Sequence, residues 1–326
     1  MPDRTLLSLY DFVRLYEKLT EEGGALRRLL GGRTERVRGI WTHPESPPKH
    51  WYNIPAIQKR LNQLASGDEK TDHRTFTAQA FLKKGGLRGL SMGCGAGQKE
   101  IQWMQTGCFD QLDAFDLSPQ RILAAQQAAQ QADMAERLTF FMSDATSFHP
   151  DPATYDVLIA EASLHHFHRL ETLIPRMTLW LKPGGLLILH EYVGPTRFQW
   201  SHAQMAAADA LLAQLPPSYR TRWNGRGIKT KHHRPGWLSM WLNDPSEAVM
   251  SDRVMPLLHQ HLVPTFIRPL GGTILHLLFD EIAHHFLHPD ETAAAFLALA
   301  SKTEDHLIAA YSLPSDFVFA VFHRSP

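Results

Sequence analysis

Three glycines at alternate positions follow a short apolar stretch of this sequence. Residues 87–92 read LRGLSM, and Gly93, Gly95 and Gly97 come next. Glycine tolerates positive φ angles and lets the backbone approach a ligand closely. Residues 98–104 favour a helix whose free N–H groups would face the turn. The spacing predicts a strand, turn and helix that bind a nucleotide-sized ligand, although such a turn alone is often only a tight connection.

A carboxylate ends the next predicted strand, residues 111–116, which reads QLDAFD. In doubly wound sheets, an acidic residue at this place accepts hydrogen bonds from ribose hydroxyls, and we expect Asp116 to do so. Ser118 and Pro119 follow and are typical of a helix N-cap and of the first helical position. Asp116 therefore strengthens the interpretation of the glycine turn as a nucleotide site.

Two histidines follow another predicted strand, residues 155–162, in the run EASLHHFH. Ligands of open α/β sheets bind beyond the carboxyl ends of the strands, which places Glu161, His165 and His166 near the ligand. Histidine titrates near neutral pH, so His165 is our candidate for removing a proton from an acceptor hydroxyl. The alternative is that these residues begin a helix and line the pocket without titrating, and the sequence favours neither.

Glu191 and Tyr192 end a further predicted strand, residues 184–192, and would reach the same crevice. We group them with His165 as catalytic candidates. The Tyr192 ring could orient an acceptor or face a cation, although an aromatic residue at a strand end more often only packs. The expected substrate pocket comprises Trp51, Tyr52, His166, Arg197 and Trp200. We interpret the basic run at residues 220–234 as a solvated loop in preference to an anion site.

Strands and helices alternate between residues 86 and 194, which indicates a parallel sheet with helices on both faces. The expected strands are 87–92, 111–116, 138–143, 155–162 and 184–192, and helices are expected at 98–104, 119–133 and 170–181. Strands at 262–268 and 316–323, the latter antiparallel, would complete the sheet, with helices at 273–286 and 290–310 between them.

The remaining segments read mainly as helices and loops. Helical spacing occurs at 5–30, 51–64 and 74–84, and a helix is expected at 204–215 inside a segment rich in Trp, Pro, Arg and His. The expected division is a helical extension at 1–85, a nucleotide-binding core at 86–194, an inserted cap at 195–257, and completion of the core at 258–326.

Residues 87–193 resemble the class I S-adenosylmethionine-dependent methyltransferases in their strand, G-x-G-x-G turn, acidic strand end and later Asp144. The resemblance implies an α/β fold with a doubly wound, seven-stranded Rossmann-like sheet, and S-adenosylmethionine as cofactor. Asp144 would contact the adenine amino group. Ser91 stands where the family usually has an acidic residue near the methionine amino group. The implied cofactor-binding residues are Ser91, Gly93, Cys94, Gly95, Gly97, Asp116, Leu117, Asp144, Ala145 and Glu161.

The run EYVGPTRFQW at residues 191–200, with the later GGTILH at 271–276, also resembles a functionally undefined group of bacterial methyltransferase-like proteins that share E-Y-V-G-P-x-R-F-Q-W. An Asn-Pro-Pro-aromatic motif is absent after the strand at 155–162. Its absence speaks against the branch of the family that methylates nucleobase amino groups.

Composition narrows the class of partner. The chain has 326 residues, 44% of them apolar, which is enough to bury a full core. Its 33 basic and 33 acidic residues give no electrostatic footprint for nucleic acid, so a small-molecule substrate is expected. Two cysteines, no signal-peptide pattern and no long apolar run predict a cytoplasmic protein without a membrane partner. We expect no metal, because His284 with His288, and His166 with His168, lack further ligands at a typical spacing. The oligomeric state is left open.

These patterns predict a transferase that moves the methyl group of S-adenosylmethionine to a small acceptor by in-line displacement. One alternative keeps the cofactor but attacks its γ carbon, giving cyclisation or aminocarboxypropyl transfer with release of methylthioadenosine. Another is a regulatory protein that binds S-adenosylmethionine without turnover. The product separates the first two, because methyl transfer releases S-adenosylhomocysteine.

Overall fold

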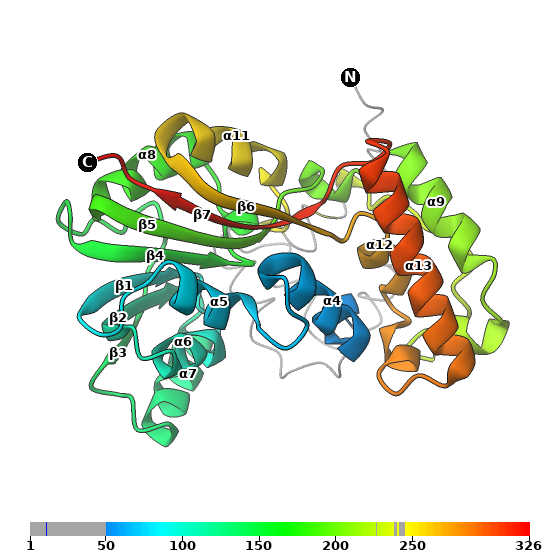
Figure 1. Ribbon diagram of the computed structural model, residues 1–326, viewed down its shortest axis with the longest axis horizontal. Coiled ribbons are helices and arrows are strands. Elements are labelled where there is room, and N and C mark those ends of the chain that lie inside the picture. The colour runs from blue at the N-terminus through cyan, green and yellow to red at the C-terminus, as the bar shows by residue number, and fades with distance from the viewer. Residues whose placement is uncertain (1–10, 12–49, 226, 238–239, 241–244) are drawn as a thin grey trace.

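A seven-stranded sheet forms the centre of the computed structural model, which describes residues 11, 50–225, 227–237, 240 and 245–326 (Figure 1). Its strands are β1 (Leu87–Met92), β2 (Phe109–Asp116), β3 (Leu138–Met142), β4 (Tyr155–Glu161), β5 (Leu181–Tyr192), β6 (Val263–Gly271) and β7 (Phe317–His323). The spatial order is β3-β2-β1-β4-β5-β7-β6. Strands β1 to β5 pair in parallel, whereas β7 runs antiparallel to β5 and β6. The expected α/β class, with a doubly wound seven-stranded sheet and an antiparallel last strand, is confirmed.

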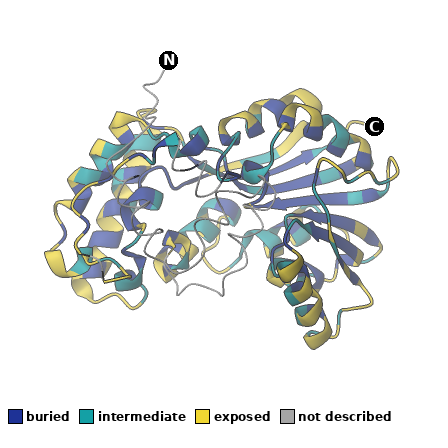
Figure 2. Ribbon diagram, turned by 180° about the vertical axis from the view of Figure 1, so that it is seen from behind, coloured by how far each residue is buried: buried dark blue, intermediate teal, exposed yellow. Residues whose placement is uncertain are grey.

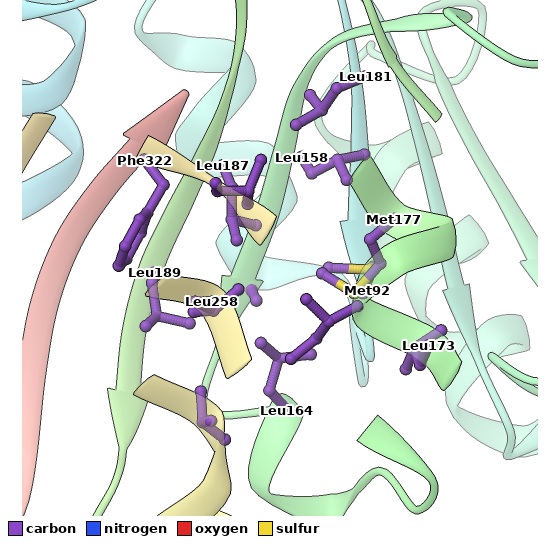
Figure 3. Close-up of a cluster of buried hydrophobic side chains, with 14 of the residues drawn as sticks. Met92, Leu158, Leu164, Leu173, Met177, Leu181, Leu187, Leu189, Leu258 and Phe322 are labelled. Carbon is purple, nitrogen blue, oxygen red and sulfur yellow. The ribbon is translucent and has the colours of Figure 1, made fainter. Parts of the chain in front are cut away.

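Helices cover both faces of this sheet: α5 (His73–Ala80), α6 (Gln98–Gln105) and α7 (Pro119–Gln131) lie on one face, and α8 (Leu170–Trp180) and α11 (Ser251–His261) on the other. Successive strand residues point to opposite faces. In β4, Leu158 packs toward α8 and α11 (Figure 3), whereas Ile159 packs toward α6 and α7. Because both faces are buried, the strands read as nearly continuous apolar runs.

A second group of helices, the helical lobe, lies beside the sheet on the right of Figure 1. It comprises η1 (Trp51–Asn53), α4 (Pro55–Ser66), α9 (His202–Leu212), α12 (Leu275–Phe279), η5 (Ala283–Phe286) and α13 (Glu291–Ala309). These elements share one buried apolar cluster that includes Trp51, Leu211, Phe279 and Phe296. Figure 2 shows buried residues along both the strands and the inner sides of these helices. The lobe is therefore assembled from three separate stretches of the chain.

The helical lobe departs from the expected division of the chain. Residues 258–326 are expected to complete the core, but α12, η5 and α13 pack with α4 and α9, because their apolar residues join that cluster. The expected boundary after residue 257 falls inside α11, which packs on the sheet. The helix expected at 51–64 is η1 followed by α4, and that expected at 74–84 is α5. The helix expected at 5–30 lies, apart from Asp11, outside the described residues. No helix in the described part of the chain has the length and apolar character needed to cross a bilayer.

Asp316 joins the helical lobe to the sheet at the start of β7. Its side chain is fully buried, and Oδ2 accepts a hydrogen bond of 2.9 Å from Gln204 Nε2 of α9. The same amide nitrogen donates to Thr273 Oγ1 at 2.7 Å. Burial raises the pKa of the Asp316 carboxyl to about 8, against the opposing effect of the Gln204 hydrogen bond.

We expect Asp316→Asn to stabilise the protein at pH 8 and to have little effect at pH 4. Between these values the folded protein holds a proton that the unfolded chain releases, so wild-type stability falls as pH rises toward the folded pKa. Asparagine is neutral throughout and should raise the free energy of unfolding by about 1–3 kcal/mol at pH 8. Urea unfolding across this pH range measures the difference. If the substitution raised the free energy of unfolding equally at both pH values, Asp316 would not be a buried carboxyl that titrates in this range.

Candidate active site

The glycine turn lies at the carboxyl end of β1 and is fixed to the next strand. The N–H groups of Gly93 and Cys94 donate to Phe115 O at 2.9 and 3.0 Å. All three glycines of the turn have positive φ angles, from 58° at Gly95 to 86° at Gly97. A Cβ added at Gly97 would lie 2.8 Å from Ala125 Cβ of α7, so glycine allows close helix packing there. Gly93, Cys94 and Gly95 line a large cavity.

Asp116 ends β2 beside this turn and lines the same cavity. Its Oδ2 accepts a hydrogen bond of 3.0 Å from Gly95 N, and Oδ1 accepts one of 2.9 Å from Ser118 N. Ser118 in turn caps α7 by accepting a hydrogen bond from Arg121 N at 3.4 Å. The carboxylate is thus oriented before any ligand binds. Leu117 also lines the cavity.

Asp144 and Ala145 follow β3 and extend this wall of the cavity. Asp144 Oδ1 accepts hydrogen bonds from Thr146 N at 2.8 Å and from Thr146 Oγ1 at 2.7 Å. Its other carboxylate oxygen has no such bond within the described residues. The carboxyl ends of β1, β2 and β3 therefore bring together most of the residues expected to bind the cofactor.

Three expected cofactor residues, Ser91, Gly97 and Glu161, do not line the cavity. Gly97 packs against α7, whereas Ser91 and Glu161 face α6. Ser91 Oγ donates to Glu100 Oε1 at 2.6 Å, and burial raises the pKa of Glu100 to about 7. Side chains alternate along a strand, so Ser91 shares the face of Leu87, and Glu161 shares that of Ile159. Attention to this alternation would have directed both side chains away from the ligand.

Glu161 instead anchors α5 and α6 to the sheet. Its carboxylate accepts hydrogen bonds from Trp103 Nε1 at 2.6 Å and from Arg74 Nη2 at 2.5 Å, and His73 Nε2 lies 3.1 Å away. Burial alone would raise the pKa of this carboxyl, but Arg74 and His73 hold it well below its ordinary value. Lys99 Nζ donates to the backbone oxygen of Glu161 at 2.7 Å. Glu161 therefore has a structural position behind the glycine turn.

Glu191 and His165 form a buried pair at the carboxyl ends of β5 and β4. His165 Nδ1 is hydrogen-bonded to Glu191 Oε1. Glu191 also accepts from the backbone N–H groups of Ser163, Leu164 and Tyr192 at 2.7–2.8 Å. Burial opposes the charge of His165, but Glu191 outweighs it and raises the pKa of the imidazole. His165 lines the cavity, whereas Glu191 lies behind it and fixes the ring.

Tyr192 lies in an aromatic wall of the cavity with its hydroxyl group occupied. Tyr192 Oη donates to Pro195 O at 3.0 Å, and burial holds the pKa of the phenol well above its ordinary value. The wall consists of Trp51, Tyr192, Phe198, Trp200, His276 and Phe317, with neighbouring ring centroids 5.0–6.2 Å apart. Tyr52 and His166 also line the cavity. Tyr192 therefore contributes its ring to the pocket.

Arg197, expected in the substrate pocket, holds a loop in place instead. Its guanidinium is buried and donates to Glu247 O at 3.0 Å and to Pro245 O at 2.9 Å. The loop carries Glu247, which lines the cavity beside His165 and His166. Sequence reasoning missed Glu247, because a lone glutamate outside any motif carries no spacing signal.

The basic run at 220–234 also differs from the expected solvated loop. Lys229 is 3% exposed and donates through Nζ to the backbone oxygens of Leu277 and Asp280, each at 2.7 Å. Burial lowers the pKa of this amine to about 8. Arg222, Lys229 and Lys231 line the cavity, and Arg222 Nε lies 3.5 Å from Glu281 Oε2. Arg226 lies outside the described residues.

The fold and the site together resemble those of the class I S-adenosylmethionine-dependent methyltransferases. The sheet order is that of the class, the glycine turn follows β1, and an oriented carboxylate ends β2. S-adenosylmethionine is the cofactor that this class implies.

Comparison with known proteins agrees with this class. Residues 90–185 match a family model described as a methyltransferase domain. The 27-O-demethylrifamycin SV methyltransferase of Amycolatopsis mediterranei is 31% identical over 133 residues, which cover 40% of this chain and 48% of that relative. A malonyl-[acyl-carrier protein] O-methyltransferase of Halalkalibacterium halodurans is 29% identical over 118 residues, covering 35% and 41% respectively. The chain thus spans less than half the length of these relatives.

A solved structure extends the likeness of fold beyond the matched segment. The geranyl diphosphate C-methyltransferase from Streptomyces coelicolor A3(2) superposes with a TM-score of 0.53 at 11% identity. The superposition covers 90% of this chain and 98% of that chain. The overall architecture, including helices outside the sheet, is therefore shared at the level of fold.

We expect Asp116→Ala to weaken S-adenosylmethionine binding by about 1.5–3 kcal/mol, or roughly 10- to 150-fold. The variant would lack the carboxylate that we expect to accept hydrogen bonds from the ribose and that holds Gly95 N. Titration calorimetry measures the affinity, with Asp151→Ala as a control on an exposed loop away from the cavity. Equal affinities in the two variants would remove Asp116 from the cofactor site.

Proposed function

We propose that the protein transfers the methyl group of S-adenosylmethionine to a small-molecule acceptor by in-line displacement. The observation that carries this proposal is one cavity of about 1550 Å³. The glycine turn, Asp116 and Asp144 line one part of it, and His165 and the aromatic wall line another. Typical ligand pockets measure about 300–1000 Å³, so this cavity has room for the cofactor and a second molecule.

We assign a role to each residue from the part of the cavity that it lines. The turn and Asp116 hold the nucleoside, and Asp144 contacts the adenine. The sulfonium already activates the methyl group, so the remaining task is to align the acceptor and exclude water. His165 accepts the proton of an acceptor hydroxyl, and Glu191 positions the imidazole through Nδ1. The Tyr192 ring bounds the acceptor as part of the aromatic wall.

An oxygen acceptor is the class we favour. The malonyl-[acyl-carrier protein] relative is named as an O-methyltransferase, and the rifamycin relative is named for a 27-O-demethylated substrate. Both names support an acceptor whose nucleophile is oxygen. A histidine oriented by a carboxylate suits the deprotonation of a hydroxyl, because the leaving proton has a nearby acceptor.

We also propose that the run E-Y-V-G-P-x-R-F-Q-W marks a group of proteins with this site. Four of its residues have separate tasks in the structure. Glu191 holds His165, Tyr192 and Trp200 belong to the aromatic wall, and Arg197 holds the loop of Glu247. A motif in which these four positions serve the same pocket fits a shared acceptor class.

The product of turnover tests the proposal. Purified protein is incubated with S-adenosylmethionine labelled in its methyl group, with small-molecule extract of cells as the source of acceptor. Release of S-adenosylhomocysteine with label in an organic product supports methyl transfer. Release of methylthioadenosine would instead indicate attack on the γ carbon. Tight binding of the cofactor with no turnover in any extract would favour a regulatory protein.

We further propose that the helical lobe and residues 196–225 close over the cavity when the cofactor binds. Trp51, Tyr52, Phe198, Trp200 and Arg222 contribute to the cavity from these segments. Closure would exclude water from the reacting atoms. Hydrogen exchange should show residues 51–64 and 196–225 gaining more protection on cofactor addition than α8, which packs on one face of the sheet and contributes no residue to the cavity. If the exchange rates of these segments do not change when the cofactor is added, the pocket is rigid and preformed.

A further inference from the structure

Two histidines and a glutamate converge on one side of the cavity. His165 and His166 belong to η2 (Leu164–His166), and Glu247 comes from the loop that precedes α11. His165 Nε2 lies 3.6 Å from Glu247 Oε1, and His166 Nδ1 lies 4.0 Å from Glu247 Oε2. One donor atom from each residue falls within 4.8 Å of the others. In the described part of the chain, this is the one group of three or more His, Cys, Asp or Glu side chains so arranged.

From this geometry we propose that His165, His166 and Glu247 hold a divalent transition-metal ion. Two imidazoles and one carboxylate are a common ligand set of catalytic zinc and non-haem iron sites. Ligand bonds of about 2.0–2.1 Å at a tetrahedral ion place the donor atoms about 3.3 Å apart. The two imidazole nitrogens lie 3.6 and 4.0 Å from different oxygens of Glu247, and one donor atom from each residue lies within 4.8 Å of the others. Binding of an ion would therefore draw these atoms inward by up to about 1.5 Å.

The residues behind the three ligands support a metal site. Metal-bound histidines usually donate their other ring nitrogen to a carboxylate or carbonyl, which fixes the ring. Glu191 takes this part for His165, and three backbone N–H groups hold Glu191. Arg197 fixes the loop of Glu247 through two backbone oxygens. Two of the three ligands are thus oriented by buried partners.

This metal site would add to the proposed function. The inference rests on that function in one respect, because the proposed methyl acceptor would supply the remaining ligand of the ion. All three residues line the cavity that would hold the acceptor. Three protein ligands leave at least one position of the ion open, and that position would take an oxygen atom of the acceptor. With the ion bound, Nε2 of His165 would be a ligand instead of the proton acceptor. The ion would lower the pKa of the bound hydroxyl, whose proton would pass to water. The acceptor class narrows to molecules with a metal-binding oxygen group, such as a hydroxyl beside a carbonyl.

Metal binding is measured without cofactor or acceptor. Full-length protein is treated with a chelator, dialysed and titrated with Zn²⁺ by calorimetry, and the Co²⁺-loaded protein is examined by visible spectroscopy. We expect one equivalent to bind, with a Co²⁺ spectrum of nitrogen and oxygen ligation. Glu247→Gln and His166→Ala should each weaken Zn²⁺ binding more than tenfold, and Glu191→Gln, which acts through His165, about 10- to 100-fold.

His285→Ala is the matched control, because His285 neighbours another histidine, His284, outside the cluster. Its affinity for Zn²⁺ should equal that of the wild type. Thermal melting establishes that each variant is folded. Zn²⁺ should raise the melting temperature of the wild type and of His285→Ala, but not that of the three variants at the metal site. Absence of stoichiometric binding, or equal affinity in Glu247→Gln and His285→Ala, would overturn the inference. Calorimetry with S-adenosylmethionine is a separate titration, so failure of the metal site leaves the proposed function standing, and the reverse also holds.

Discussion

Gly95→Val is expected to reduce S-adenosylmethionine affinity at least about a hundredfold while the protein remains folded. Gly95 has a φ angle of 58°, which a β-branched residue adopts only with strain. A Cβ at this position would lie 3.1 Å from Arg121 Nη1, inside the cavity. The altered backbone would also turn the Gly95 N–H away from Asp116 Oδ2. Titration calorimetry measures the loss of binding, and circular dichroism checks the fold.

Gly107→Val is the control for Gly95→Val, because it introduces backbone strain at a glycine outside the cofactor site. Gly107 has a φ of 73°, and a Cβ there would have open space around it, in a turn that does not line the cavity. This variant should lose stability and keep its affinity for the cofactor. If Gly95→Val binds S-adenosylmethionine as well as Gly107→Val does, the glycine turn is only a structural connection.

Glu191→Ala is expected to lower the free energy of unfolding by about 3–5 kcal/mol, as for other broken buried ion pairs. Alanine would leave the N–H groups of Ser163 and Leu164 without their acceptor and His165 without its counter-charge. Several buried polar groups would then lack a hydrogen-bond partner at the same time. Urea unfolding followed by tryptophan fluorescence gives the value.

Glu171→Ala is the control for this change, since Glu171 is an exposed glutamate whose ion pair with Arg253 spans 3.7 Å at the surface. Such a pair contributes about 0–1 kcal/mol. Glu191→Gln should retain most of the stability, because its amide oxygen can still accept backbone hydrogen bonds. A cost for Glu191→Ala no larger than that for Glu171→Ala would mean that Glu191 does not organise this end of the sheet.

The sheet and the cofactor side of the pocket could be predicted because their signals are local. A strand followed by Gly93, Gly95 and Gly97 needs only adjacent residues to be recognised. The same holds for Asp116 at the end of an apolar run. The start of a helix could likewise be predicted from adjacent residues where a capping residue was present, as at Ser118. The doubly wound, seven-stranded form of the sheet was implied by the family resemblance, and the order of its strands comes from the structure, since periodicity alone does not give the neighbours of a strand.

The acceptor side depends on contacts between distant segments, which one sequence does not reveal. Glu247 reaches His165 only because Arg197 holds its loop, and Lys229 is buried only because α12 offers it backbone oxygens. Charge alone predicted solvent exposure for Lys229. The helical lobe was hidden for the same reason, because its apolar cluster joins stretches that no local pattern connects.

The place of β7 has a consequence for how the chain folds. β7 lies between β5 and β6 in the sheet but follows both of them in the chain. During synthesis, β5 therefore presents an unpaired, apolar edge while the whole stretch from η3 (Thr196–Phe198) to α13 is made, and β6 has no neighbour in the sheet until β7 pairs with it. Unpaired strand edges of this kind promote aggregation, and long-range pairing is slow. We expect refolding to be slow and its yield to fall at high protein concentration, with pairing of β7 as the late event.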